Sequence, residues 1–191
     1  MKFILILPFL VWLLTSFDFK KQAEAKIIWK SSQRLSWRNY KAFPDTMSSY
    51  KAMTFVQVGL EVKEFRDSLV IAIPCYFFEN LSWSKNQHST LLLKHEQLHF
   101  DIAELISRKI RKEFSEYKYY DLKLAYKDLQ KIYDRNYKIK LDSINSKYDL
   151  ETDHGVIVQR QNEWERKIAN ELRRLDRYTS TKVILKRQKS Q

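Results

Sequence analysis

The chain contains little of what usually interrupts or cross-links a protein fold. Of its 191 residues only one is cysteine, two are glycine and three are proline. A single cysteine, Cys75, excludes an internal disulfide, and its apolar neighbours favour a buried small side chain over a reactive thiol. The scarcity of glycine and proline permits long uninterrupted helices. Because no disulfide can form within the chain, its stability must come from packing, and a bound metal ion would add to it.

The first residues have the pattern of an export signal. Residues 3–17 form an apolar run behind the basic residue Lys2, and Ala23-Glu24-Ala25 has the small-residue pattern of a cleavage site. The apolar run is shorter than the roughly 20 residues that a membrane span needs. The sequence therefore predicts a signal peptide over residues 1–25 and a secreted or periplasmic protein. A membrane anchor is the alternative if this segment is not cleaved.

The chain has a marked excess of positive charge. Removal of residues 1–25 takes away three lysines and two acidic residues, so the net charge falls from +12 to +11. Such a charge favours anionic partners, which include envelope lipids, wall polymers and nucleic acid. Most of the basic residues are mixed with acidic ones, however, as on a solvated helix surface, so nucleic acid is not expected as the main partner. Residues 179–191 are expected to form a frayed basic tail.

The pattern of apolar residues changes near residue 85. Before it, residues 54–62 alternate between apolar and polar side chains, and residues 68–78 form a β-rich run that is expected to pair with them as a hairpin. Short edge strands are expected at residues 27–29 and 81–83. Beyond residue 85 the periodicity is helical, with helices expected over residues 89–116, 121–148 and 156–175. We therefore expect one domain over residues 26–178, of class α+β, with a small antiparallel or mixed sheet followed by long helices.

The most specific signal is the run His95-Glu96-Gln97-Leu98-His99, which has the His-Glu-x-x-His form of zinc peptidases. On a helix, residues four apart lie about 40° apart around the axis, so His95 and His99 can direct two imidazoles at one ion. Glu96 lies at the flank of that face, where its carboxylate can act as the general base that activates water. The alternative is a pair of histidines that pack in a core or lie in solvent.

A catalytic zinc site usually has three protein ligands and one open position. Asp101 and Glu104 face away from the two histidines around the helix, and Glu113 lies about 21 Å along the axis, so these three are excluded. If the second long helix runs antiparallel to the first, the segment after it returns to the motif. This segment contains His154, which is the only histidine downstream of the motif and is the predicted third ligand.

Alternatives remain open around this third position. His154 could be an exposed loop histidine, and Asp149 or Asp153 could ligate the metal or orient a ligand imidazole. Tyr148 is a candidate donor of a hydrogen bond to the developing oxyanion, although a tyrosine at helical spacing is more often a core residue. Residues 79–84 could bind an extended peptide as an exposed sheet edge, but Trp83 favours packing there.

Residues 35–172 resemble a bacterial secreted family known as domain of unknown function 922, which is grouped with zincin-type metallopeptidases. The matching residues are Leu35-Ser-Trp-Arg-Asn-Tyr40, Ser82-Trp83, the block from Leu92 to Glu104, Tyr148-Asp149 with Thr152 and His154-Gly155, and Gln161 with Trp164. The resemblance implies a zincin-like fold, metal positions at His95, His99 and His154, and a general base at Glu96. The chain departs from the family motif at Leu98, where glycine is expected, which changes the packing beside the ligands rather than the ligands.

The leading hypothesis is a secreted or periplasmic zinc (Zn2+) peptidase, a hydrolase that acts on peptide or protein substrates, which include those of the cell envelope. An envelope protein without catalytic activity, with a structural or vestigial metal site, is the alternative. Amidase action on wall peptides is a third hypothesis, because the same chemistry cleaves any accessible amide.

Overall fold

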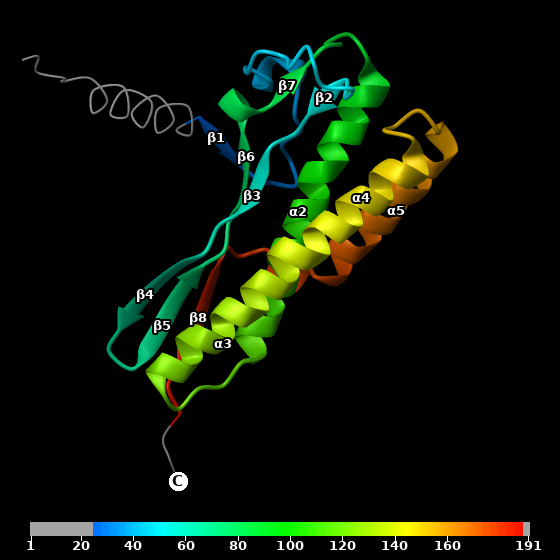
Figure 1. Ribbon diagram of the computed structural model, residues 1–191. Coiled ribbons are helices and arrows are strands. Elements are labelled where there is room, and N and C mark those ends of the chain that lie inside the picture. Colours follow the sequence, from blue (N-terminus) through cyan, green and yellow to red (C-terminus); the bar gives the residue numbers. More distant parts are fainter. Residues whose placement is uncertain (1–24, 189–191) are drawn as a thin grey trace, which may run out of the picture.

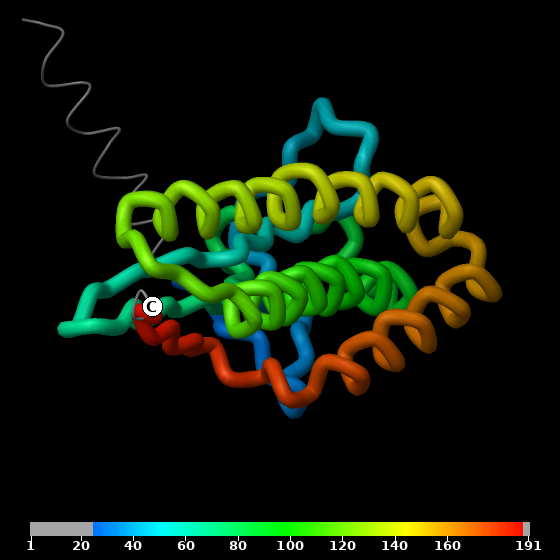
Figure 2. The backbone as a smooth tube through the Cα atoms, turned by 90° about the horizontal axis from the view of Figure 1, so that it is seen from below, coloured from blue at the N-terminus to red at the C-terminus, as the bar shows by residue number. Residues whose placement is uncertain are grey.

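The computed structural model describes residues 25–188, so almost all of the predicted signal peptide lies outside the described residues. Helix α2, Thr90–Glu116, runs through the middle of the molecule and is covered by the other elements (Figure 2). Its start is capped by the Ser89 side chain, which accepts a hydrogen bond from the Leu92 amide at 3.1 Å. Side chains are buried on almost every side of this helix, from Leu92 to Phe114. The first predicted long helix is therefore confirmed within one residue, and it is the central element of the fold.

The second predicted long helix consists of three consecutive segments. They are α3, Leu122–Asp134, a π-helical segment, Arg135–Leu141, and α4, Asp142–Thr152. In the wider π-helical segment the buried side chain of Asn136 donates hydrogen bonds to the Ile132 carbonyl and to Glu113 of α2. The helix runs antiparallel to α2 and ends one turn later than predicted (Figure 1). This extra turn determines which side chains reach the histidines of α2.

The third predicted helix is α5, Val158–Arg174. It packs against α2 and α4 and carries the chain back along the other side of α2 (Figure 2). Of the helices among residues 25–188, none is both long and apolar enough to cross a membrane.

Within residues 25–188 the strands form three small antiparallel sheets, with the strand orders β1-β6-β3, β2-β7 and β4-β5-β8. Their bounds are β1, Lys26–Ile28, β2, Ala52–Met53, β3, Val56–Val58, β4, Glu61–Phe65, β5, Ser68–Ala72, β6, Cys75–Phe78, β7, Trp83–Ser84, and β8, Lys182–Lys186. The predicted α+β class, with small antiparallel strand pairings beside long helices, is confirmed, but the single predicted sheet is divided into three.

The predicted hairpin exists, but each of its two strands is divided in two. One breaks at Gly59 and the other at Pro74, and the Gly59 amide donates to the Pro74 carbonyl at 2.7 Å. A side chain at residue 59 would lie 3.0 Å from both Pro74 and Tyr76, so glycine permits this close crossing. The hairpin therefore contributes β3 and β6 to one sheet and β4 and β5 to another.

The predicted frayed tail is wrong for residues 182–186, which form β8 along the whole length of β5. Val183 and Leu185 are buried, whereas Lys182, Ile184 and Lys186 are exposed, so the segment has the alternation of an amphipathic edge strand. The excess of lysine concealed this alternation. The domain therefore extends past residue 178, and the sheet combines strands from both halves of the chain.

Candidate metal centre

Helix α2 brings the two motif histidines together as their spacing predicts. The Nε2 atoms of His95 and His99 lie 3.2 Å apart, and the two rings meet edge to face at 4.8 Å between centroids. His95 is only 2% exposed, and His99 is 14% exposed at its side chain. Two ring nitrogens therefore face one point at the wall of a cleft.

Asp149 of α4 supplies the third atom at this point. Its Oδ1 lies 3.1 Å from His95 Nε2 and 3.0 Å from His99 Nε2, so the three atoms form a nearly equilateral triangle. Zinc bonds of about 2.0–2.1 Å in a tetrahedral site give ligand separations of about 3.3–3.4 Å. The triangle is only slightly tighter than this, and two imidazoles with one carboxylate are a donor set that zinc accepts.

Hydrogen bonds to the far sides of the rings determine which nitrogens carry protons. Asn145 Oδ1 lies 3.1 Å from His99 Nδ1, and Gln161 Oε1 lies 3.4 Å from His95 Nδ1. The Gln161 amide nitrogen donates to Glu165 at 3.0 Å, so its oxygen must face His95. An oxygen of this kind only accepts, which assigns the proton to Nδ1 and leaves the lone pair on Nε2.

With both rings neutral in this tautomer, the triangle contains lone pairs and no proton to share between them. In agreement, Asp149 Oδ1 is a buried oxygen without a hydrogen-bond donor among the described residues. Three acceptor atoms this close together repel one another unless a cation or an added proton lies between them. The residues thus fit a bound metal ion.

The pKa shifts of Asp149 and His99 in the metal-free site also favour a bound cation. Burial alone would raise the pKa of Asp149, but its contacts with His95 and His99 hold it well below the usual range. Burial alone would lower the pKa of His99, but Asp149 and the charge of Glu96 raise it overall. The site therefore attracts positive charge, and a proton on His99 can take the place of a metal ion.

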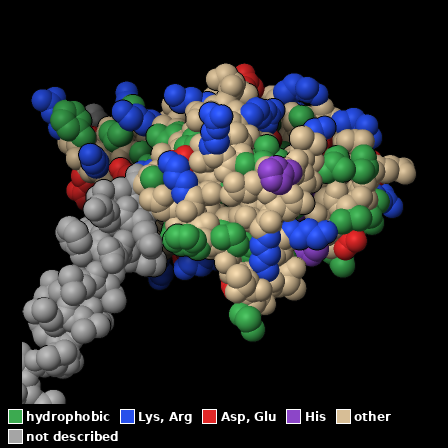
Figure 3. Space-filling model, turned by 90° about the horizontal axis from the view of Figure 1, so that it is seen from above, with side chains coloured by type: hydrophobic (Ala, Val, Ile, Leu, Met, Phe, Trp, Pro, Cys, Tyr) green, Lys and Arg blue, Asp and Glu red, His purple; other side chains and the backbone are tan. Residues whose placement is uncertain are grey.

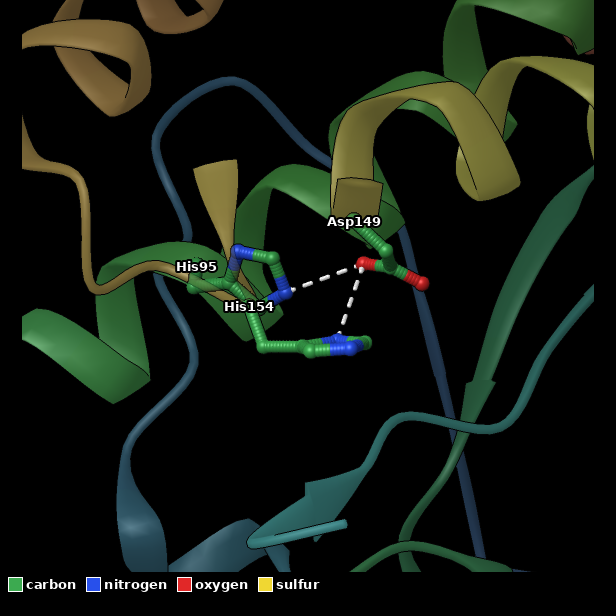
Figure 4. Close-up of side chains that lie close together, drawn as sticks. All are labelled: His95, Asp149 and His154. Atoms are coloured by element: carbon green, nitrogen blue, oxygen red, sulfur yellow. Dashed lines mark ion pairs between the residues drawn. The ribbon is translucent and has the colours of Figure 1, made fainter. Parts of the chain in front are cut away.

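The predicted third ligand, His154, lies near the triangle but outside it. Its Nδ1 is 3.9 Å from Asp149 Oδ1, and its side chain is 50% exposed beside the Tyr50 ring. The donor atoms of His95, Asp149 and His154 lie within 4.8 Å of one another (Figure 4). Asp149, one of the alternatives at this position, is thus the nearest third donor, and His154 is a neighbour on the open side.

A strained turn puts His154 there. Asp153, His154 and Gly155 all have positive φ angles, of 47°, 52° and 84°. A side chain on residue 155 would come within 2.8 Å of His95 Cβ, so glycine is required both for the backbone angle and for the close approach. Strain of this kind in non-glycine residues is typical of functional sites.

Glu96 lies beside the triangle, as predicted, and is 4% exposed. It lines a cleft of about 540 Å³ together with His95, His99, Asp149 and His154. The opposite wall of the cleft is formed by residues 49–54, which include β2. His88, predicted to be a surface residue, is exposed before α2, and histidine side chains reach the surface of that end among many Lys and Arg side chains (Figure 3).

The prediction of Tyr148 as an oxyanion donor is wrong for this structure. Its ring is fully buried and stacks on the His95 ring at 4.5 Å, and its hydroxyl donates to Gln161 Oε1 at 2.6 Å. Burial raises the pKa of this hydroxyl well above its usual value. Tyr148 therefore packs behind the His95 ring and is not among the residues that line the cleft.

Trp83 is packed, as the sequence favoured, and residues 79–84 do not form the alternative exposed edge. They comprise the 3-10 turn Glu79–Leu81 and the strand β7, whose Trp83 and Ser84 are buried against β2. The strand that lines the cleft is β2, which pairs with β7 on one side only.

Sequence reasoning missed three residues of the site, Thr54, Asn145 and Gln161. Asn145 lies four residues before Asp149 on the same helix, a spacing that indicates a shared face. Gln161 belongs to the residues of the family resemblance, but no role followed from it there. The sequence holds no comparable signal for Thr54.

Comparison with known proteins adds no family assignment. No family model, curated protein or solved structure matches this chain. The resemblance to a zincin-type family stays a prediction, and the site must be interpreted from its own geometry.

Proposed function

We propose that the protein is a secreted or periplasmic zinc-dependent peptidase with a zincin-like fold. The observation that carries this proposal is the convergence of His95 Nε2, His99 Nε2 and Asp149 Oδ1 within 3.2 Å of one another. Such a cluster is costly to bury unless a cation completes it. The cleft in front of it and the adjacent Glu96 favour a catalytic site over a structural one.

Each residue has a separate part in holding the ion. His95, His99 and Asp149 are the ligands, and His154 borders the open side, where a fourth ligand or the substrate has access. Gln161 and Asn145 hold the two rings with their Nε2 atoms toward the centre. When bound, zinc supplies Lewis acidity, which polarises an amide carbonyl and makes water more acidic.

Glu96 is the general base of the proposed reaction. It takes the proton from the water that attacks the amide carbon and then delivers that proton to the departing amine. Its low exposure keeps bulk water from competing for the carboxylate. Loss of a positioned base of this kind lowers the rate by about 100- to 10,000-fold.

The cleft suits a peptide in an extended conformation. Residues 51–54 line it, and β2 has a strand partner on one side only among the described strands. A substrate backbone can add to the other side of β2 and place one of its amides over the triangle. Met53, Leu92 and Val156 add apolar contacts for the substrate side chains.

The test combines zinc analysis of the purified protein with cleavage of a broad peptide library. The wild type should bind one zinc ion and cleave peptides, and Glu96→Gln should keep the zinc and lose cleavage. His88→Ala, which changes an exposed histidine outside the cleft, is the matched control and should retain both. A wild type without zinc affinity contradicts the proposal. Zinc binding without any cleavage supports the alternative of an envelope binding protein with a structural metal.

A further inference from the structure

One oxygen of the proposed base is already occupied. Thr54 Oγ1 donates a hydrogen bond of 2.5 Å to Glu96 Oε2. Thr54 directly follows β2, so this bond joins the cleft wall that faces the substrate to the motif helix. Within residues 25–188 no hydrogen-bond donor contacts Glu96 Oε1, and this carboxylate lines the cleft.

A second hydroxyl fixes the direction of this bond. The Tyr40 hydroxyl lies 2.8 Å from Thr54 Oγ1. Threonine has a single hydroxyl proton, and Thr54 gives it to Glu96, so Tyr40 must be the donor in its contact with Thr54. The hydrogen-bonded chain therefore runs from Tyr40 through Thr54 to Glu96.

The far end of the chain is anchored in the core. Tyr40 is 3% exposed, and its ring meets Trp37 at 4.9 Å and Phe77 at 5.2 Å between centroids. These edge-to-face contacts with two aromatic rings restrict where the Tyr40 hydroxyl can lie. The position of Thr54 Oγ1 is thereby tied to the packing of the sheet rather than to the surface loop alone.

We propose that Tyr40 and Thr54 are positioning residues for Glu96. The chain holds the carboxylate in one orientation, with Oε2 bound to Thr54 and Oε1 free to accept the proton from the attacking water. This inference rests on the proposed peptidase function. It assigns a specific task to two residues that neither bind metal nor touch the reacting atoms.

The position of Thr54 adds a consequence for substrate binding. A peptide that pairs with β2 lies along the strand that leads into Thr54. Any shift of β2 on binding is passed to Glu96 through a single hydrogen bond. Substrate engagement and alignment of the base are thereby coupled, and the coupling requires a hydroxyl at residue 54.

Steady-state kinetics of zinc-loaded Thr54→Val, Thr54→Ser and Tyr40→Phe test the chain. Valine has the shape of threonine without the hydroxyl, so kcat should fall about 10- to 100-fold, as for other misplaced catalytic groups, with KM changed less than about twofold. Serine restores the hydroxyl and should return kcat to within about threefold of wild type. Tyr40→Phe should lower kcat by a smaller factor. Tyr126→Phe is its matched control, because it removes a tyrosine–glutamate hydrogen bond at an exposed site.

Two kinetic results would overturn the inference. One is an unchanged kcat in Thr54→Val at full zinc occupancy. The other is an equal loss in Thr54→Ser and Thr54→Val, which would show that side-chain volume rather than the hydroxyl matters.

A second measurement keeps the inference testable even if no peptide is cleaved. The side-chain carboxyl carbon of Glu96, labelled with 13C and identified through Glu96→Gln, should shift in Thr54→Val and return in Thr54→Ser. An unchanged chemical shift of this carbon in Thr54→Val overturns the inference. If the signal shifts while the wild type cleaves nothing, the peptidase proposal fails and the hydrogen-bonded chain stands.

Discussion

Polar side chains are buried on both sides of α2, but the two sides differ in how these groups are satisfied. Away from the cleft, Asp101 accepts hydrogen bonds from Trp29, Gln97 and Arg34. On the same side Glu104 is paired with Arg108 and Arg111, and Arg111 also donates to the Ile73 carbonyl.

On the cleft side, His95 Nε2, His99 Nε2 and Asp149 Oδ1 lie within 3.2 Å of one another, and Asp149 Oδ1 has no hydrogen-bond donor among the described residues. The difference separates structural polar networks from ligand sites. A network that satisfies its own donors and acceptors needs nothing further, whereas a buried cluster of acceptors needs a cation.

The largest loss of stability should come from removing a member of the paired network on the side away from the cleft. Glu104→Ala leaves two buried guanidinium groups without their carboxylate, which should lower the free energy of unfolding by about 3–5 kcal/mol. Urea unfolding measures the loss. Glu116→Ala, which removes the exposed partner of Lys112 on the same helix, should cost less than about 1 kcal/mol. The zinc content of the remaining folded protein should not change, and a fully stable Glu104→Ala variant that lost zinc would contradict the division between the two sides.

Removal of a proposed ligand on the cleft side should lower the zinc affinity rather than the stability of the protein. Asp149→Ala should weaken zinc affinity by about 100- to 1000-fold, which is one ligand's share of a typical zinc binding energy. Asp142→Ala in the same helix is the matched control, because this residue is exposed outside the cleft. His154→Ala should have a smaller effect than Asp149→Ala. Competition titration with a chelator measures all three, and the reverse ranking would make His154 the third ligand.

A smaller loss is expected when a ring loses its support. Gln161→Leu removes the oxygen that faces His95 Nδ1 and accepts from Tyr148, so zinc should bind about 10- to 100-fold more weakly. Gln159→Leu, on an exposed part of the same helix, should bind zinc like the wild type. Equal affinities for the wild type and Gln161→Leu would mean that the orientation of His95 is fixed by packing alone.

The mildest test is the pH dependence of zinc binding. The raised pKa of His99 means that a proton competes with zinc from a higher pH than for an ordinary histidine, whose pKa is about 6.5. Affinity should therefore fall as pH is lowered through that raised pKa, by up to about tenfold per pH unit for one displaced proton. The lowered pKa of Asp149 keeps its carboxylate ionised over this range. Calorimetry in buffers of different ionisation enthalpy gives the number of protons released on zinc binding, and a number that does not rise as pH is lowered would contradict the competition.

The helical half of the molecule could be predicted from the sequence. Helical spacing and the Ser89 cap place His95, Glu96 and His99 on α2 without tertiary information. The choice between Asp149 and His154 as the third ligand could not be made from the sequence. It depends on one further turn of α4, which directs Asp149 toward α2, and on three left-handed residues that carry His154 outward. Nothing in the composition of residues 149–155 fixes where that helix ends.

The strands show a related limit. Gly59 and Pro74 lie inside the two strands predicted as continuous, and their opposition across the hairpin follows only from the register of β3 and β6. β8 was hidden because its partner, β5, lies more than a hundred residues earlier in the chain. Long-range pairing of this kind leaves only a weak alternation in the local sequence.

Anomalous diffraction from crystals of the full chain soaked in zinc tests the central claim most directly. We expect one strong zinc peak about 2 Å from His95 Nε2, His99 Nε2 and Asp149 Oδ1, with the open side toward His154. A structure in which these three atoms stay together without a metal, or in which zinc binds elsewhere, would contradict it.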